Sequence, residues 1–267
     1  MKKIIALTLS VLMVLSLAAC AESAPAPAAT EAAKEEAAAT VKTVQPGKLI
    51  MATNAAFPPY EFIADDGKTI VGIDAEIAGM VASELGLELQ IEDIEFASIL
   101  TAIQTGKADV GLAGMTVTEE RLQNVNFSSV YAKGVQSVIV SEGSDIKSID
   151  DLSGKKIGVQ ESTTGHIYCE DDFGADNVTA FSNGANAVQA LLSGKVDCVV
   201  IDNNPAKEFV KANEGLVILD TSYAEEDYAA AISKDNEELL KAFNEVLDKK
   251  IADGTVQGIL DKYISAN

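Results

Sequence analysis

The stretch AIQTGKADV at residues 102–110 resembles ALLSGKVDC at residues 190–198, with glycine, lysine and aspartate at the same positions. Each stretch reads as the end of a helix, then a glycine, a lysine and an aspartate that opens a strand. The glycine stands where the end of a helix commonly needs a left-handed residue. This recurrence indicates that the chain contains two similar halves.

A second matched pair lies upstream of the first, in the same order. GKLIMAT at residues 47–53 and GKKIGVQ at residues 154–160 both read as a first strand that enters a loop. Glycine and polar residues are common where strands and helices meet, so either pair alone could also arise without a repeat, and that alternative stays open. Two pairs in one order favour the duplication of an α/β unit.

Strand-like and helical segments alternate through both halves. The strand-like runs fall at 48–53, 87–91, 109–113, 135–140, 155–159, 178–181, 197–201 and 216–219. The helical patterns fall near 74–85, 97–105, 163–172, 185–193, 203–212, 236–252 and 255–264. This alternation predicts an α/β fold with mainly parallel sheets and helices on both faces.

The amino-terminal end has the pattern of a secretory signal. Two lysines precede an apolar run at residues 4–17, and the run closes on small residues before Cys20. A basic start, a short apolar core and small residues before a cleavage point are typical of such signals. The ending LAAC resembles the bacterial lipoprotein signal, so we expect a signal peptide at 1–19 and a lipid on Cys20. A core cysteine at the end of an apolar run is the alternative.

Residues 20–45 are expected to form a tether. They are nearly all Ala, Glu, Pro, Thr and Lys, and no apolar stripe recurs that would offset the entropy of ordering. A flexible chain of this length reaches about 25–30 Å. The remaining ~220 residues suit one large or two medium domains.

Composition excludes several classes of function. The formal net charge of −21, with no basic stripe, argues against nucleic acid. His166 is the only histidine, so a multi-histidine metal site and a catalytic triad are excluded, and we expect neither metal nor cofactor. Cys169 and Cys198 could pair outside the cytoplasm, but Cys198 lies in an apolar run and we favour two unpaired core thiols.

The repeat places two segments on facing walls. Carried forward, it aligns Gly114 with Asp202, and each follows the carboxyl end of an equivalent strand. Ligands of open α/β sheets bind at that edge. Two such edges that face each other would form a cleft with one binding wall in each half.

Arg121 is the only arginine of the chain, and it lies just beyond the first of these walls. A planar bidentate donor suits a carboxylate better than lysine does. Gly114 would let a ligand approach the backbone, and Thr116 offers a hydroxyl. The spacing from Thr116 to Glu119 also fits a capping box, so a plain helix cap is an equal alternative for Thr116.

Asp202 ends an apolar run on the opposite wall, where an unpaired carboxylate would be costly. It either caps the helix that follows or awaits a cationic group of a ligand. With Arg121 it complements a zwitterion: the arginine would take an α-carboxylate and the aspartate an α-ammonium. The loop 160–165 opens a helix on the same wall, and its amides could support the carboxylate.

Aromatic side chains near the first loop are candidates for contact with a ligand side chain. Phe57, Tyr60 and Phe96 could sandwich such a group. Packing in the core is an equally good interpretation of each of them.

Four motifs together resemble those of the bacterial family 3 solute-binding proteins, which are polar amino-acid receptors of ABC importers. They are GIDAEI at 72–77, FPPYEF at 57–62, GMTVTEER at 114–121 and IDN at 201–203. The resemblance covers roughly residues 46 to 267. It is specific because the motifs occur together.

The resemblance implies a two-lobe periplasmic-binding-protein-like fold of type II, with two hinge strands between the lobes. Lobe 1 would take residues 46–132 and 228–267, and lobe 2 residues 133–227. The crossovers are expected near Tyr131 to Val135 and near Ser222 to Ala229.

The resemblance also implies the ligand-binding residues. In such proteins an arginine at the position of Arg121 clamps the α-carboxylate, and an aspartate at the position of Asp202 holds the ammonium. The other expected lining residues are Asn54, Phe57, Phe96, Gly114, Thr116, Gln160 and Thr164. Several relatives with basic ligands carry an acid in place of Asn54, which argues against a strict Lys/Arg preference unless Glu161 or Glu61 supplies the charge.

The implied function is capture of a polar L-amino acid and its delivery to the permease of an ABC importer. The protein would be a monomer outside the cytoplasm, in the periplasm or lipid-anchored to the outer face of the cell membrane. One alternative is an enzyme similar to a periplasmic dehydratase of the same fold, with Glu161 or Asp202 as the acid. Another is the sensing module of a receptor.

Overall fold

The computed structural model describes residues 41–220 and 222–264. The predicted signal peptide, the predicted lipidation site Cys20 and nearly all of the predicted tether lie outside the described residues. In the described part of the chain, every helix is too short or too polar to cross a membrane.

The first of two large sheets is built from both ends of the described chain. Its strand order is β5 (Glu88–Asp93), β1 (Lys48–Thr53), β6 (Val110–Gly111), β14 (Ala231–Ser233) and β7 (Val125–Phe127). The strands β5, β1 and β6 run parallel, whereas β14 is antiparallel to both of its neighbours. The carboxyl-terminal part of the chain therefore returns to complete the sheet that the amino-terminal part begins.

Alternate residues of β1 serve the two faces of this sheet. Leu49 and Met51 pack in one buried cluster with the helices α2 (Ile73–Glu84), α8 (Glu237–Ala252) and α9 (Thr255–Tyr263). Ile50 and Ala52 pack in another cluster with α3 (Phe96–Gln104). The apolar run of β1 thus covers both faces, as expected of a buried parallel strand.

The second large sheet repeats this plan with the order β10 (Val178–Phe181), β9 (Ile157–Gln160), β11 (Cys198–Asp202), β8 (Ala132–Ser141) and β12 (Leu216–Ile218). The first three strands are parallel, and β8 is antiparallel to β11 and to β12.

Helices cover both faces of this second sheet. The helix α5 (Thr164–Phe173) packs on one face, and α6 (Gly184–Leu192) and α7 (Asn203–Ala212) pack on the other. Cys169 and Cys198 lie buried in the cluster under α5, and both are free thiols. Short 3-10 helices cover Ile149–Leu152 and Ala175–Asn177.

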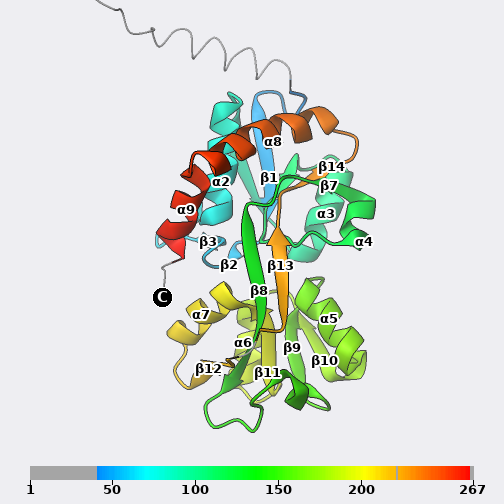
Figure 1. Cartoon of the computed structure of the whole chain (residues 1–267), viewed down its shortest axis with the longest axis vertical. Coiled ribbons are helices and arrows are strands. Elements are labelled where there is room, and N and C mark those ends of the chain that lie inside the picture. Colours follow the sequence, from blue (N-terminus) through cyan, green and yellow to red (C-terminus); the bar gives the residue numbers. More distant parts are fainter. Residues whose placement is uncertain (1–40, 221, 265–267) are drawn as a thin grey trace, which may run out of the picture.

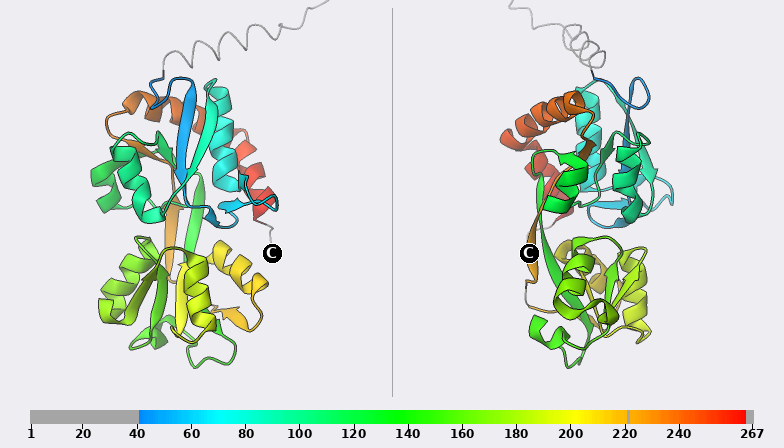
Figure 2. Two further views of the ribbon diagram at one scale, coloured as in Figure 1. Left: turned by 180° about the vertical axis from the view of Figure 1, so that it is seen from behind. Right: turned by 90° about the vertical axis from the view of Figure 1, so that its right-hand side faces the viewer.

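Two paired strands connect the large sheets (Figure 1). The strand β8 pairs antiparallel with β13 (Ala224–Tyr228), from Ala132 opposite Tyr228 to Gln136 opposite Ala224. Figure 2 shows from two further sides that these strands run side by side between the two bodies. The predicted crossovers fall on them, and the exact lobe boundaries remain a prediction.

The repeated glycines end their helices in the same way. Gly106 has a φ of 67° and Gly194 a φ of 70°, the left-handed conformation that favours glycine. The amide of the following lysine donates to a carbonyl of the preceding helix in both halves, at 2.8 Å for Lys107 and 2.9 Å for Lys195. The sequence repeat is therefore a structural repeat.

The repeated aspartates also share a role. The backbone amide of Asp109 donates to the carbonyl of Ile50, and that of Asp197 donates to the carbonyl of Lys156. Their carboxylates accept from the same segments in return, from the Ile50 amide at 2.8 Å and from the Lys156 amide at 2.8 Å. Asp109 is buried and also accepts from the amide of Val44, whereas Asp197 is exposed.

The sequence patterns missed the shorter strands and the mixed character of the sheets. The small sheet of β2 (Ala56–Phe57), β3 (Glu61–Ile63) and β4 (Ile70–Val71) was not predicted, nor were β7 and β14, and β13 was expected only from the resemblance, as the hinge strand near Ser222 to Ala229. The predicted strand at 109–113 shortens to β6. These strands have two to five residues, and β13 reads AEEDY, so an apolar run does not mark them.

Replacing Asp109 with alanine should lower the free energy of unfolding by about 2 kcal/mol, because the buried amide of Ile50 and that of Val44 lose their acceptor. Urea unfolding followed by circular dichroism measures the effect. The matched control is Asp197→Ala, which removes the equivalent contact at an exposed position and should change the stability by about 0.5 kcal/mol or less. Equal losses in the two variants would contradict this account of the repeat.

Candidate functional site

A cavity lies between the two bodies at the carboxyl ends of both parallel sheets. Its unfilled space is about 440 Å³, including the opening to solvent. All nine residues predicted for the ligand site contribute to its lining. The full lining is Asn54, Phe57, Glu61, Phe96, Ala113, Gly114, Thr116, Arg121, Gln136, Gln160, Thr163, Thr164, Val200, Ile201, Asp202, Glu226 and Tyr228.

Arg121 supplies the only positive charge among these lining residues. It lies on the short helix α4 (Glu119–Asn124), and only 6% of the residue is exposed. Its Nη1 donates to the carbonyl of Thr116 at 2.8 Å, and its guanidinium carbon lies 5.4 Å from the centre of the Phe96 ring. Burial lowers the pKa of Arg121, and the negative charge of Glu226 acts in the opposite direction.

Arg121 makes no ion pair with any carboxylate of residues 41–220 and 222–264. Neutral carbonyls hold two of its amino groups, so hydrogen bonds orient the guanidinium while no anion of the described residues compensates its charge. The guanidinium is therefore positioned and still has capacity for an anion.

The helix-cap interpretation of Thr116 is wrong. Thr118 caps α4, because its hydroxyl accepts from the backbone amide of Arg121 at 3.2 Å. The hydroxyl of Thr116 lies 3.4 Å from that of Thr164 on the opposite wall. Thr116 is thus a buried hydroxyl of the cavity.

Gly114 brings the backbone to the cavity surface. Its φ is 52°, and a Cβ there would lie 2.8 Å from the Phe57 ring. Its amide donates to Asp74 Oδ2 at 2.8 Å, and the hydroxyl of Tyr131 donates to the same oxygen at 2.8 Å. One buried carboxylate thus joins the cavity wall to the residue that precedes β8.

Asp74 forms a buried pair with Glu61. Burial raises the pKa of Asp74 to about 6, although hydrogen bonds from Gly114, Tyr131 and Glu61 lower it in part. Burial, followed by the charge of Asp74 and the hydrogen bond to it, raises the pKa of Glu61 well above its ordinary value. Both burial and the neighbouring carboxylate of Asp74 favour the neutral form of Glu61.

Asp202 dominates the opposite wall and is 1% exposed. Its Oδ1 accepts from the amide of Asn204 at 3.0 Å, so it does cap α7. Its Oδ2 accepts from the amide of Val135 at 2.9 Å and from the hydroxyl of Tyr228 at 2.8 Å. Burial raises the pKa of Asp202 to about 6, and the hydrogen bonds from Tyr228, Asn204 and Val135 partly reverse that shift.

The two interpretations of Asp202, as a helix cap and as a carboxylate of the cavity, therefore do not exclude each other. It caps a helix, and it lines the cavity as a buried carboxylate. All of its hydrogen bonds come from neutral donors, so no cation of the described residues compensates its charge.

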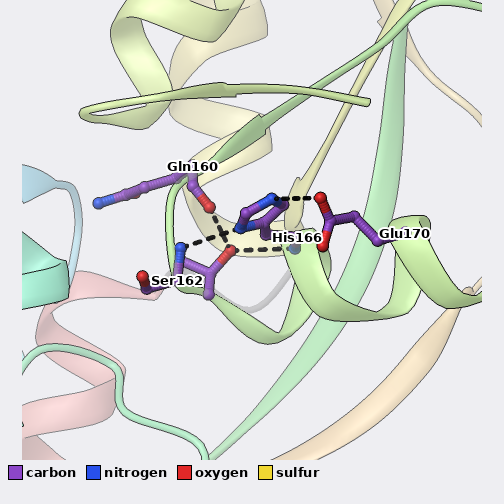
Figure 3. Close-up of polar contacts among 5 residues, drawn as sticks. Gln160, Ser162, His166 and Glu170 are labelled. Atoms are coloured by element: carbon purple, nitrogen blue, oxygen red, sulfur yellow. Dashed lines mark hydrogen bonds and ion pairs between the residues drawn. The ribbon is translucent and has the colours of Figure 1, made fainter. Parts of the chain in front are cut away.

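The side chains of Thr163 and His166 hold the turn from Gln160 to Thr164 (Figure 3). The hydroxyl of Thr163 donates to the carbonyl of Gln160 at 2.8 Å and accepts from the amide of His166. The imidazole Nδ1 of His166 accepts from the amide of Ser162 at 3.1 Å, and its Nε2 lies 3.3 Å from Glu170. Ser162 takes a φ of 64°, which is strained for a residue with a side chain.

This turn points the carbonyl of Ser162 at the first wall. Nη2 of Arg121 donates to that carbonyl at 3.0 Å. His166 therefore supports the turn from behind and does not line the cavity. Glu161 is exposed and lies outside the lining, so it supplies no charge to the cavity.

The two walls touch each other at several points. Nε2 of Gln160 donates to Oδ1 of Asn54 at 3.0 Å, and Asn204 donates to the hydroxyl of Tyr60 at 3.1 Å. With the contact between Arg121 and Ser162, these bonds hold the walls in a closed arrangement.

The aromatic candidates divide between the cavity and the core. Phe57 and Phe96 line the cavity, as predicted. Tyr60 is fully buried behind it, stacked on Phe57 at 5.7 Å and edge-on to Tyr228 at 5.2 Å. The core interpretation is right for Tyr60.

The sequence patterns did not identify the cavity residues on the connecting strands. Gln136 lies on β8, and Glu226 and Tyr228 lie on β13. Their strands carry no motif that the patterns could use, although the acidic pair Glu225 and Glu226 inside an expected crossover was a visible signal. The other unpredicted lining residues are Glu61, Ala113, Thr163, Val200 and Ile201.

Comparison with known proteins agrees with this geometry. The family model for bacterial extracellular solute-binding proteins, family 3, matches residues 49–266. The arginine-binding extracellular protein ArtP of Bacillus subtilis is 33% identical over 226 residues, which are 82% of this chain and 86% of ArtP. The L-cystine-binding protein TcyJ of Escherichia coli K12 is 29% identical over 230 residues, which are 85% of this chain and 86% of TcyJ.

A solved structure gives the same result for the fold. The structure of an ancestral arginine-binding protein bound to glutamine matches with a TM-score of 0.79 and 39% identity, and the match covers 83% of this chain and 100% of that one. These proteins are named for binding and not for catalysis, so the enzyme alternative has no support from them. The chain belongs to family 3 of the bacterial extracellular solute-binding proteins.

Proposed function

We propose that this protein captures a polar L-amino acid between its two walls and delivers it to the permease of an ABC importer. The observation that carries the proposal is the charge arrangement of the cavity. A buried guanidinium on one wall and a buried carboxylate on the other both lack an ion pair within the described residues. An α-carboxylate and an α-ammonium group are their complement.

The named relatives support recognition of the α-amino-acid group. ArtP is named for arginine, TcyJ for L-cystine, and the ancestral protein was solved with glutamine. These ligands differ in their side chains and share the α-carboxylate and α-ammonium groups. In this proposal Arg121 takes the carboxylate, Asp202 takes the ammonium, and Thr116, Thr164 and Gly114 complete the contacts.

The remaining predicted residues would surround the ligand side chain. Phe57 and Phe96 would pack against it, and Asn54 and Gln160 would close over it from opposite walls. Closure around the ligand would exclude water, which strengthens both charge contacts. A ligand that bridges the walls stabilises the closed form, and that form is what a permease could recognise.

The lobes are proposed to divide as the resemblance implies, at residues 46–132 with 228–267 and at 133–227. The mature protein is proposed to be a lipid-anchored monomer. Its signal peptide of residues 1–19 would be removed and Cys20 would carry the lipid, with residues 20–45 as the tether to the outer face of the cell membrane. More than one acyl chain would be needed, because a single chain holds a protein only marginally.

Replacing Arg121 with alanine should weaken amino-acid binding by two to three and a half decades, or about 3–5 kcal/mol, because the ligand carboxylate would be buried without its partner. Isothermal titration calorimetry with the tightest-binding amino acid measures this loss. Arg121→Lys keeps the charge but loses the planar fork, so its affinity for the amino acid should lie between those of the unmodified protein and the alanine variant. Unchanged binding by the alanine variant would remove the proposed clamp.

Binding should weaken as the pH falls below about 6. The pKa of Asp202 stands near 6 before an ammonium arrives, so at lower pH the carboxylate must lose a proton to accept the ligand. The affinity should then fall by about tenfold per pH unit. Asp74 also titrates near pH 6 behind Gly114, so Asp202→Asn is the control that assigns the effect. That variant should bind weakly with a flat profile between pH 5 and 7, and an unchanged slope would refute the assignment.

Replacing Cys20 with alanine should release the protein from the membrane, because the lipid would have no attachment point. Fractionation of expressing cells measures the change, and mass spectrometry of the amino-terminal peptide detects the acyl groups. The matched control is Cys198→Ala, a buried thiol that should leave membrane attachment intact. Membrane attachment of the Cys20→Ala variant equal to that of the unmodified protein would refute the lipid anchor.

A further inference from the structure

The connecting strands form the back wall of the cavity. The register pairs Gln136 with both Asp202 and Ala224, and pairs Gly134 with Glu226. Paired residues of antiparallel strands share a face, and every second residue of a strand returns to it. Gln136, Glu226 and Asp202 therefore lie on the one face that lines the cavity.

Two oxygen atoms on this back wall lack a hydrogen-bond donor. Gln136 Nε2 donates to Glu226 Oε2 at 2.9 Å, which fixes the orientation of the amide. The other oxygens, Gln136 Oε1 and Glu226 Oε1, are buried and have no hydrogen-bond donor within 3.5 Å among the described residues. The hydroxyl of Tyr168 on α5 is the polar group that competes for Glu226, since the charge of Glu226 and a hydrogen bond to it raise the pKa of Tyr168. Buried acceptors of this kind are rare in folded proteins, since each one costs about 1–3 kcal/mol. A group that offers donors and no acceptors would satisfy both.

The described lining of the cavity holds three carboxylates, on Glu61, Asp202 and Glu226, and one cation, on Arg121. Arg121 matches an α-carboxylate, and Asp202 matches an α-ammonium. Glu61 also lines the cavity, and burial together with the neighbouring Asp74 raises its pKa, which favours its neutral form. Glu226 is 5% exposed and forms no ion pair within the described ranges, and a neutral amino acid offers it no cationic group once the ammonium lies against Asp202.

We propose that Glu226 and Gln136 form a subsite for a second cationic group, so that the preferred ligand is an α-amino acid with a positively charged side chain. The inference rests on the proposed function and names its substrate class. It also removes the difficulty raised by Asn54, because the acid comes from a connecting strand and not from the first loop. Neither Glu161 nor Glu61 is required to supply the negative charge for a basic side chain.

Other polar groups face Glu226 and define the competing interpretation. Its charge acts on Arg121, on Asp202 and on Tyr168, whose hydroxyl lies nearby on α5. Glu226 could therefore act only by positioning Arg121. That role would weaken every amino acid alike, whereas a cation subsite affects charged side chains alone.

The experiment compares arginine with citrulline, which has nearly the same shape and no side-chain charge. Isothermal titration calorimetry at pH 7.5 should show that the protein binds arginine at least about tenfold more tightly. Glu226→Gln should reduce this ratio to about threefold or less and should leave the citrulline affinity within about threefold. Gln136→Met should also reduce the ratio, because it removes the second acceptor.

The matched control is Glu225→Gln on the same strand, which removes an exposed acid and should leave the ratio unchanged. Melting curves check that each variant is folded. Equal losses of arginine and citrulline binding in Glu226→Gln would overturn the subsite in favour of the positioning role. An absence of preference in the unmodified protein would overturn it even if that variant fails to fold.

Failure of the proposed function gives a different result. If no α-amino acid, charged or neutral, produces heat or raises the melting temperature, the proposed function falls and the subsite falls with it. If glutamine and citrulline bind as well as arginine and lysine, only the subsite falls.

Discussion

Two opposite charges, buried on facing walls without a direct ion pair, are the constraint on which the rest of this structure depends. Burying a charge without a partner is unfavourable, so each must be held by oriented neutral groups. Two carbonyls hold Arg121, and two amides and a hydroxyl hold Asp202. The carbonyls that hold Arg121 belong to both walls, and the donors that hold Asp202 belong to its own wall and to the connecting strands. The fold therefore brings together segments distant in sequence to keep both charges in place.

The connecting strands do more than link the two bodies. Val135 and Tyr228 donate to Asp202, and Tyr131 donates to Asp74, which in turn holds the amide of Gly114. A change in the angle between the bodies would alter these contacts at once. Hinge and binding walls thus share hydrogen bonds, and a ligand that favours one arrangement shifts the whole equilibrium.

Much of the fold and of the candidate site could be predicted from residues with strong local reasons. The glycine and aspartate repeat predicted the two bodies, because a left-handed helix end followed by a carboxylate that accepts from a neighbouring strand leaves few alternatives. The lone Arg121, the wall position of Asp202 and the loop 160–165 predicted the cavity. Gln136, Glu226 and Tyr228 were missed because their importance comes from the register of β8 with β13, which is a long-range pairing. Thr116 and Tyr60 were ambiguous because spacing along the chain does not reveal which way a side chain faces.

The most direct test is a crystal structure of the protein grown with the amino acid that binds most tightly. The account predicts that both carboxylate oxygens of the ligand lie within hydrogen-bond distance of the Arg121 guanidinium, and that its ammonium nitrogen lies within that distance of the Asp202 carboxylate. Density for the ligand in the reverse orientation, or outside the walls that carry these two residues, would contradict it.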